Sequence, residues 1–430
     1  MRGFLIGLLV CLWPTISVAQ DTSMLAASRK VDWTLAGVSG GIPARATQCG
    51  SEVAPYTGTA ATINTAITNC TAGQHVKFGA GTFNLTSTVN LKTDVTLRGT
   101  TGPNTTILSF SGTQTTCSNG GAWVCIKGGT NSDGSSPDQT ANWTAGYTQG
   151  ATSITLSQKT NLAVGMVLVI DQLVDGTTRA SDTWPDIFQC IAATVCVQGN
   201  NGSAPLNGRG SGATARAQFE IVRVTSIAGG ACPCAIGITP GLKMPNWQSG
   251  LTPQAWWSNT ASITGAGLED VRVTSASGSP QHLVDFFWAT DSWMENVQVD
   301  GAISTGGKFV HLDLARAITI QHSYIFGTSG ADEYAVDCFT CGDSLFQNNI
   351  VQHLRSGFIH EMGVGNVIAY NYHINQFDNG FLQGAQDNHG SGGAYWLVEG
   401  NDGALGTELE NYWGHANFIT VFRNYSVGWQ

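Results

Sequence analysis

Six ionisable or amide side chains recur at one position of successive short apolar segments. Each follows an aliphatic residue, beginning with Val284 and Val310. The six are Asp285, His311, Asp337, His360, Gln383 and Glu410, at intervals of 23 to 27 residues. Side chains along a strand alternate between its faces, so a polar residue after an inward aliphatic one points outward. Parallel strands lie about 4.8 Å apart, which predicts a column facing water about 25 Å long.

Two carboxyl groups near this column have a spacing that suits hydrolysis of a glycosidic bond. Such hydrolysis needs one carboxylate and one protonated carboxylic acid, which inverting enzymes hold about 6.5–9.5 Å apart. Asp313 lies two residues after His311, and His311 is expected beside Asp337, which gives a diagonal of about 7–8 Å. We therefore predict Asp313 and Asp337 as the catalytic pair. Asp285, His311 and His360 are predicted to support it by orientation or proton transfer.

Two other interpretations of the column stay open. Outward polar side chains occur on any exposed parallel sheet, so the column could be a solvated face. The carboxylates of Asp285, Asp313 and Asp337 could instead hold calcium, which takes clustered oxygen ligands. The hydrolytic prediction itself requires no metal or cofactor.

Further residues are predicted to contact a sugar. His389 lies on a glycine-rich stretch, where a turn requirement explains the glycines equally well. Tryptophans can stack on sugar faces or pack in a core. The predicted substrate-binding residues are Glu361, Gln383, His389, Glu410, Trp288 and Trp413. In a lyase, Arg316 and Arg355 would be the candidates for the base or the substrate anchor.

The elements that must position these residues form a repeat. Short alternating β-branched segments return every 22 to 30 residues between about 267 and 425. Such a period predicts a solenoid, in which each coil buries its apolar face against its neighbours. Each segment ends in a small or amide residue, and these could stack as an amide ladder at one corner. The reference residues are Ser275, Gly301, Ser323, Asn349, Asn371, Asn401 and Asn424.

The N-terminal part carries a resemblance to a known superfamily. Residues 59–70 place Ala60, Ile63, Ala66 and Ile67 on one helical face, and two glycine-punctuated strand segments follow between 75 and 99. This order resembles the first segment of the pectin-lyase-like right-handed parallel β-helix superfamily. The resemblance covers roughly 45–113 and 261–429. It implies a β-helix whose open end is capped by the helix. No enzyme family's motifs match, so it implies no site residues.

The predicted organisation has four parts. Residues 1–20 have the positive start, apolar stretch and small-residue end of a signal peptide. Residues 21–113 form the cap and first coils, and 261–430 form the main coils. Between them, residues 114–260 lack the repeat pattern and contain glycine-, serine- and asparagine-rich loops with two strong strand pairs. This favours an inserted β-rich module over long loops. The fold class is thus all-β, a right-handed parallel β-helix. The chain ends directly after a repeat, which favours a fragment.

Composition narrows the partners and the compartment. The formal net charge is −10 and only 11% of residues are charged, which argues against nucleic acid. No segment after the signal is long and apolar enough to span a membrane. Ten cysteines remain after the signal, and their even number predicts disulfides in an oxidising compartment. We predict a secreted protein, extracellular or periplasmic, with a polysaccharide partner and an oligomeric state left open.

Three functions follow in order of preference. The first is a polysaccharide-degrading glycoside hydrolase that uses the carboxylates above. The alternative is a non-catalytic glycan-binding or adhesive solenoid, and the third is a polysaccharide lyase. Glycan turnover and the chemistry of the products would separate the three.

Overall fold

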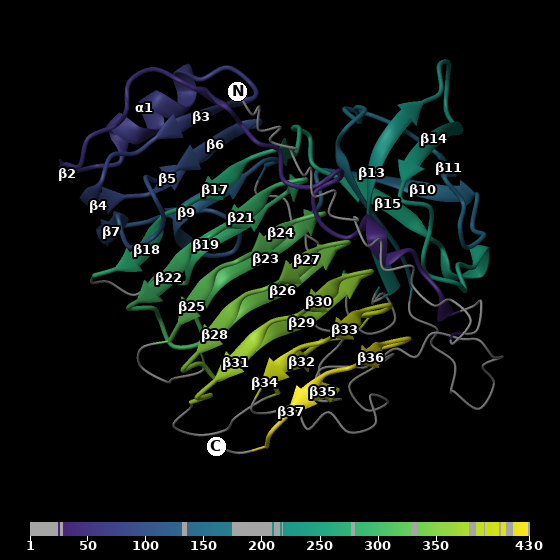
Figure 1. Cartoon of the computed structure of the whole chain (residues 1–430). Helices are drawn as coiled ribbons and strands as arrows, with labels where there is room; N and C mark the ends of the chain where they lie inside the picture. The colour runs from purple at the N-terminus through teal and green to yellow at the C-terminus, as the bar shows by residue number, and fades with distance from the viewer. Residues whose placement is uncertain are drawn as a thin grey trace, which may run out of the picture. The chain divides into compact units, whose positions relative to one another are not determined.

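The computed structural model describes residues 25, 29–130, 136–173, 209, 216, 218–276, 280–327, 333–377, 384–390, 392–403, 406–409 and 416–428. Three parallel sheets dominate these residues, and each coil between the first and the last contributes a strand to each sheet (Figure 1). The prediction of an all-β parallel β-helix with an N-terminal helix and an inserted β-rich module is confirmed.

The three sheets are named in the order in which a coil passes through them. Sheet 1 contains β1 (Thr47–Gln48), β3 (Gln74–Lys77), β6 (Val95–Arg98), β17 (Gly267–Glu269), β21 (Trp293–Glu295), β24 (Thr319–Gln321), β27 (Leu345–Gln347), β30 (Val367–Ala369), β33 (Leu397–Glu399) and β36 (Thr420–Phe422). Sheet 2 contains β2 (Thr57–Gly58), β4 (Gly81–Ser87), β7 (Thr106–Thr113), β18 (Arg272–Ser275), β22 (Gln298–Gly301), β25 (Tyr324–Phe326), β28 (Ile350–Gln352), β31 (Tyr372–Ile374), β34 (Asp402–Gly403) and β37 (Tyr425–Ser426).

Sheet 3 carries the predicted column of ionisable residues. It contains β5 (Val89–Asn90), β9 (Gly121–Lys127), β19 (His282–Phe287), β23 (Lys308–Arg316), β26 (Tyr334–Gly342), β29 (Ser356–Val364), β32 (Gln386–Asn388) and β35 (Thr407–Leu409), with β8 (Thr115–Thr116), β16 (Ile263–Thr264) and β20 (Ala289–Thr290) at its margins. Its central strands are the longest parallel strands of the β-helix, with nine residues each in β23, β26 and β29.

The interior is apolar and is covered at its first coils by the predicted helix. Val284, Val310 and Val336 lie in one buried cluster with residues from all three sheets. Helix α1 (Ala61–Asn69) adds Ile63 and Ile67 to this cluster. A coil without such a cover would expose its core and an unpaired edge.

The predicted amide ladder is present at the corner between sheets 1 and 2. The Asn349 side chain donates to Oδ1 of Asn371 at 2.9 Å, Asn371 donates to Asn401 at 3.0 Å, and Asn401 donates to Asn424 at 2.9 Å. The ladder ends at Ser323, whose backbone N–H donates to Oδ1 of Asn349 at 3.0 Å. The predicted extension to Ser275 and Gly301 is wrong, because these residues lie at the ends of β18 and β22, whereas Ser323 lies before β25, whose Tyr324 pairs with Gln298.

The inserted module is a closed six-stranded antiparallel barrel. Its strand order is β10 (Gln139–Ala145), β11 (Ser153–Leu156), β14 (Cys234–Thr239), β13 (Gln218–Ile227), β12 (Val167–Gln172) and β15 (Gln254–Trp257). An apolar cluster joins the barrel to sheet 3, with Phe219 and Trp256 from the barrel and Phe287 and Leu314 from the β-helix. Two single turns of 3₁₀ helix, Trp33–Leu35 and Ser249–Leu251, complete the described elements.

Four disulfides, each between cysteines close in the sequence, agree with the prediction from the even number of cysteines. They are Cys49–Cys70, Cys117–Cys125, Cys232–Cys234 and Cys338–Cys341. Cys190 and Cys196 lie outside the described residues. Among the described helices, none has the length and apolar character that crossing a membrane requires.

Candidate functional site

Sheet 3 brings three of the predicted residues into one column. The register pairs Asp285 with His311 and His311 with Asp337. The repeat of 26 residues between their aliphatic neighbours accounts for this alignment, because Val284, Val310 and Val336 also pair in register and enter the core together. This part of the predicted column is therefore correct.

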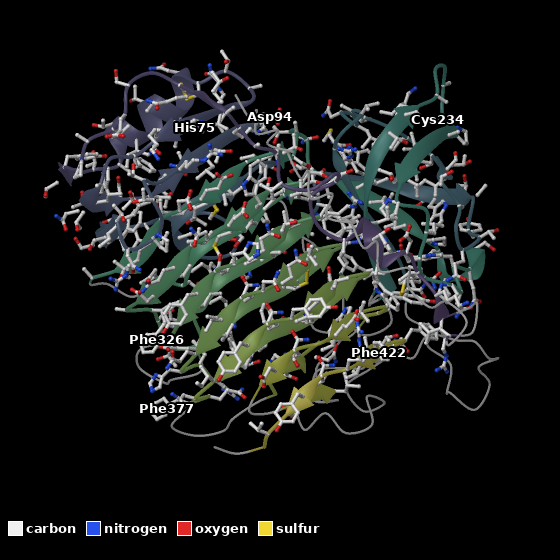
Figure 2. The ribbon with its side chains drawn as sticks, viewed as in Figure 1. His75, Asp94, Cys234, Phe326, Phe377 and Phe422 are labelled. Atoms are coloured by element: carbon white, nitrogen blue, oxygen red, sulfur yellow. A yellow bond between two sulfur atoms is a disulfide. The ribbon has the colours of Figure 1, made fainter. Side chains whose placement is uncertain are left out.

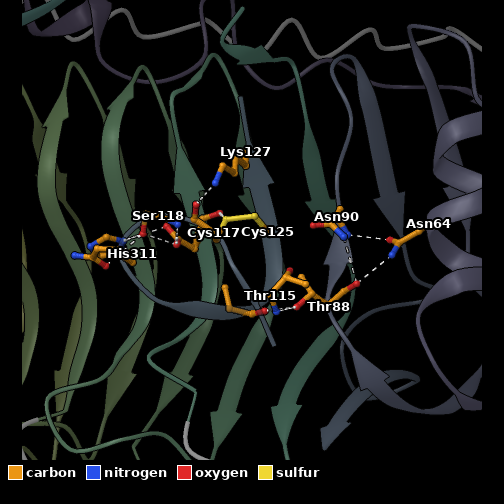
Figure 3. Close-up of a disulfide and its surroundings, with 12 residues drawn as sticks. Asn64, Thr88, Asn90, Thr115, Cys117, Ser118, Cys125, Lys127 and His311 are labelled. Carbon is orange, nitrogen blue, oxygen red and sulfur yellow. Dashed lines mark hydrogen bonds and ion pairs between the residues drawn. A yellow bond between two sulfur atoms is a disulfide. The ribbon is translucent and has the colours of Figure 1, made fainter. Parts of the chain in front are cut away.

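The predicted exposure of the column to water is wrong. Asp285, His311 and Asp337 are at most 1% exposed, and Asp313 is 4% exposed. A loop closed by the Cys117–Cys125 disulfide covers the beginning of the column, as Figure 3 shows for Ser118 and His311. Figure 3 also shows Lys127 beside this loop, where its Nζ donates to the carbonyl of Cys117 at 2.6 Å.

Ser118 in this loop holds Asp285 in place. Its backbone N–H and its Oγ both donate to Oδ2 of Asp285, at 3.0 and 2.6 Å. The other oxygen, Oδ1, accepts from Nδ1 of His311 at 3.0 Å. Burial alone would raise the pKa of Asp285, but the charge and hydrogen bond of His311 lower it below its usual range. Asp285 is therefore a carboxylate fixed by three donors.

His311 is a buried imidazolium at neutral pH. Burial would lower its pKa, but the charge and hydrogen bond of Asp285, with the charges of Asp337 and Asp313, raise the pKa to about 9. One ring face stacks on His282, with centroids 4.0 Å apart and planes at 10°. Burial, followed by the charge of His311, holds the pKa of His282 well below its usual value, so His282 is neutral.

Asp337 stands apart in this cluster because its oxygens accept no hydrogen bond from the described residues. Its Oδ2 lies 3.9 Å from Nε2 of His311 and 3.9 Å from Nζ of Lys308. The side chain of Lys308 is 17% exposed, and its Nζ lies 4.0 Å from the ring centroid of Tyr334. A buried carboxylate normally has several donors, so the open acceptor positions of Asp337 mark it as a candidate reacting group.

Asp313 occupies a different position from the one predicted beside Asp337. Its backbone pairs with Thr340, because an extra residue, Phe339, interrupts the register of β23 and β26 after Leu312. The Thr340 hydroxyl donates to Asp313 Oδ1 and accepts from the Leu314 N–H at 2.6 Å. Asp313 acts on the column through its charge, which contributes to the raised pKa of His311.

The prediction for His360 is wrong. Val336 pairs with Phe358, so Asp337 faces Ile359, and His360 is in register with Cys338. Side chains alternate between faces, and this shift of one residue turns His360 into the β-helix. It lies 5.9 Å from the ring of Phe346 and is 1% exposed. Burial lowers its pKa to about 3, which makes it a neutral core histidine.

The corrected register extends the column through residues that the sequence pattern missed. Ile359 pairs with Asp387, and Asp387 pairs with Glu408. Nδ1 of His389 lies 4.0 Å from Oδ2 of Asp387, and its side chain is 19% exposed. Lys308 and Tyr334 were also missed, although both stand three residues before a column residue, and Ser118 could have been found from the short Cys117–Cys125 spacing.

The predicted substrate-binding residues have different outcomes. Trp288 is wrong for this role, since it is fully buried and meets Trp256 edge-on at 5.8 Å where the barrel packs on sheet 3. Glu361 is 5% exposed, and His389 lies near the ring of Tyr334 at 6.5 Å. Gln383, Glu410 and Trp413 lie outside the described residues.

The donor atoms of His282, Asp285 and His311 lie within 4.8 Å of one another, a spacing that could hold a metal ion. The geometry of the rings argues against this use. A metal binds in the plane of an imidazole ring, and two parallel stacked rings cannot both direct a lone pair at one ion about 2 Å away. The arrangement therefore favours an imidazolium–carboxylate cluster over a metal centre.

The chain matches no protein-family model. No curated protein matches it either. It is similar to the solved tailspike protein gp49 of Pseudomonas phage LKA1, at 12% identity and a TM-score of 0.45, over 81% of this chain and 51% of that one. It is also similar to the tailspike gp61 of Pseudomonas phage phi297, at 11% identity and a TM-score of 0.35, over 80% and 60%. A third is the gp54 tailspike of Acinetobacter baumannii bacteriophage AP22 in complex with A. baumannii capsular saccharide, at 11% identity and a TM-score of 0.29, over 85% and 66%.

The chain spans about half to two thirds of the length of these three tailspike structures. Identities near 11% and TM-scores below 0.5 give no information on activity. The pectin-lyase-like resemblance stays an expectation, because no family model supports it. The parallel β-helix is established by the chain's own strand register.

Proposed function

We propose that this protein processes a polysaccharide and that Asp337 is the carboxylate that reacts. The observation that carries the proposal is a fully buried carboxylate without a hydrogen bond from the described residues, set between the cations of His311 and Lys308. An aspartate with a purely structural role would be saturated with donors, as Asp285 is. Asp337 has acceptor capacity left for a water or a sugar hydroxyl.

The proposed reaction is hydrolysis. Asp337 takes a proton from a water molecule while the water oxygen attacks the anomeric carbon, and a second carboxylic acid gives its proton to the departing sugar oxygen. The sequence spacing predicts Asp313 as this acid, but the observed register favours Asp387, two strands from Asp337 in the same column. Two strand spacings are about 9.6 Å, close to the separation in inverting enzymes.

Asp285 and His311 have a positioning role in this proposal. The imidazolium places a positive charge 3.9 Å from the Asp337 carboxyl group, on the same strand as Lys308. Lys308 is on the more exposed side of Asp337, so its flexible side chain must move aside for a sugar to reach the carboxylate. Tyr334 and the half-buried Arg355, 5.8 Å from its ring, would then line the approach.

The test is a panel of neutral and acidic polysaccharides incubated with the mature protein, followed by assays for new reducing ends and for unsaturated uronates. Asp337→Asn should lower the cleavage rate by about 10²–10⁴-fold, the usual contribution of a general acid or base. The matched control is Glu52→Gln, an exposed carboxylate of the N-terminal coils that lies in neither candidate surface and should keep the wild-type rate. Full activity in Asp337→Asn would reject the proposal, and unsaturated products would identify a lyase.

A second candidate function is glycan binding without cleavage, and it has its own supporting observation. Sheet 2 carries a row of exposed or half-buried rings in register: Tyr324, Tyr372 and Tyr425 occupy one column with Ile350 and Asp402. Beside them Phe326 stacks on His353 at 5.6 Å, and His353 stacks on Phe377 at 4.4 Å. Figure 2 labels Phe326 and Phe377 at this margin. Binding without turnover across the panel would favour this function.

A further inference from the structure

A cavity of about 550 Å³ lies against sheet 1, separate from the Asp337 cluster on sheet 3. Its lining comes from the segment 34–42, from β24 and β27 of sheet 1, and from Arg223 of the barrel. The volume is within the range of about 300–1,000 Å³ that small-molecule sites have. The cavity is therefore large enough for one or two sugar units.

The charged lining consists of two arginines and one aspartate, although the whole chain has a net charge of −10. Arg316 is 6% exposed and uses Nε for an ion pair with Oδ2 of Asp343 at 3.2 Å. Asp343 is also paired with Lys243. Among the described residues, none accepts a hydrogen bond from the terminal nitrogens of Arg316. The two terminal nitrogens of a buried guanidinium, with four N–H groups, thus remain for a ligand.

Arg223 provides a second guanidinium at this cavity. Its side chain is 36% exposed, and its Nη1 lies 3.4 Å from Oδ2 of Asp291. Guanidinium groups present paired donors that match the two oxygens of a carboxylate. The lining therefore has two positive guanidinium groups and one negative carboxylate, an excess of one positive charge that an anionic ligand would balance.

The neutral part of the lining is preorganised for hydroxyl groups. Gln347 donates to the side-chain oxygen of Gln321 at 2.9 Å, and Gln321 donates to Glu295 at 3.0 Å, so both amides have a fixed orientation. The side-chain oxygen of Gln347 has no partner among the described residues and is free to accept from a hydroxyl. Amide acceptors beside guanidinium donors are suited to a sugar that also carries a carboxylate.

Residues 34–42, which form one wall of the cavity, pack closely on sheet 1 at Gly37 and Val38. Gly37 has φ +85°, and a Cβ there would lie 2.6 Å from Oγ1 of Thr319. The next residue, Val38, donates its N–H to that same oxygen at 2.9 Å. Gly40 and Gly41 also have positive φ, but a Cβ on either would meet open space. The wall is thus fixed at Gly37 and leaves room at Gly40 and Gly41.

We propose that this cavity binds a carboxylate-bearing pyranose, a uronic acid unit, with Arg223 and Arg316 on its carboxylate and Gln347 on a hydroxyl. The site is distinct from the Asp337 column, and its occupation does not require cleavage of a glycan. The proposal therefore stands or falls separately from the proposed hydrolysis.

The experiment compares galacturonate with galactose, which differ only in the C6 carboxylate, by isothermal titration calorimetry on the full mature protein. Galacturonate should bind at least about tenfold more tightly than galactose, because it forms charge-assisted hydrogen bonds. Equal binding of the two sugars, or no binding of galacturonate, would overturn the proposal. Acetate that competes as well as galacturonate would overturn the sugar specificity and leave a general anion site.

Variants place the binding in the cavity. Arg223→Gln should weaken galacturonate binding about tenfold, whereas Arg272→Gln, the matched arginine paired with Asp300 on sheet 2, should leave it unchanged. Asp291→Asn should strengthen binding several-fold, since it removes the competing carboxylate; a merely structural Asp291 would predict weaker binding instead. If Arg223→Gln fails to fold by circular dichroism, Arg223→Lys replaces it, with weaker binding expected because lysine lacks the paired donors. Unchanged affinity in a folded Arg223 variant would contradict the assignment.

Discussion

The Asp285, His311 and Asp337 side chains lie in one column but differ in their hydrogen bonds. Ser118 and His311 saturate Asp285 with donors, and Asp285 in turn keeps His311 protonated. Asp337 also lies near His311, with Oδ2 3.9 Å from Nε2, but it accepts no hydrogen bond from the described residues. Asp285 and Asp337 are equally buried and differ only in their partners, which is why we propose Asp337 and not Asp285 as the reacting group.

The protonation of His311 predicts a pH dependence of stability. Its pKa rises from about 6.5 in the unfolded chain to about 9 in the folded protein, so its stabilising contribution is complete below pH 6.5 and is lost as the pH rises through 9. The free energy of unfolding should fall by up to about 3 kcal/mol over this range. Urea denaturation at pH 6 and pH 9.5 measures the change. His311→Gln should remove this fall, whereas the exposed His322→Gln should retain it; an equal fall in both variants would show that other groups cause it.

At the scale of the coil, the sequence could predict register only where the repeat length is constant. The two intervals of 26 residues from Val284 to Val336 place Asp285, His311 and Asp337 together. The next coil is shorter, and Phe339 adds a residue to β26, so the apolar pattern around Phe358 and Ile359 allows two alignments. The wrong one put His360 in the column. Packing inside the coil decides whether Phe358 or Ile359 pairs with Val336, and the sequence periodicity contains no information on that packing.

The amide ladder is the element that fixes the corner of each coil. Asn371 is 1% exposed, accepts from Asn349 and donates to Asn401 and to the carbonyl of Phe346. Asn371→Ala should lower the free energy of unfolding by about 2–3 kcal/mol, because it leaves buried partners without hydrogen bonds. Urea denaturation against Asn84→Ala, an exposed asparagine on β4, is the measurement. The control should change by less than about 0.5 kcal/mol, and a similar loss in both would argue against a special role for the ladder.

At the scale of the whole molecule, the site predicted from the sequence differs from the observed site because distant segments of the chain bury some of the predicted residues. Asp285 and His311, predicted to face water, are covered by the loop that contains Ser118, and Trp288 is covered by the barrel. Strand alternation predicts which way a side chain points, but the segment that packs over it comes from elsewhere in the chain. The cavity beside Arg223 and Arg316 likewise could not be predicted from the repeat pattern, because the barrel and residues 34–42 both contribute to its lining.

The barrel attachment predicts the effect of a substitution at Trp288. Trp288→Ala should lower the free energy of unfolding by about 3–5 kcal/mol, the usual cost of removing a large buried ring. It should also increase hydrogen exchange in β12 and β13, which pack against sheet 3 in the same cluster. Val164→Ala, at an exposed barrel position, is the control and should change neither quantity. A loss of glycan affinity with unchanged stability would restore the sugar-binding role of Trp288.

The central claim is that a sugar reaches Asp337, and a crystal structure of Asp337→Asn soaked with the oligosaccharide that the protein binds most tightly tests it most directly. We expect a glycosidic oxygen or an attacking water within about 3 Å of the side chain at position 337, with Lys308 moved away from it. An oligosaccharide seated only along the tyrosines of sheet 2, with the Asp337 column still closed, would contradict it.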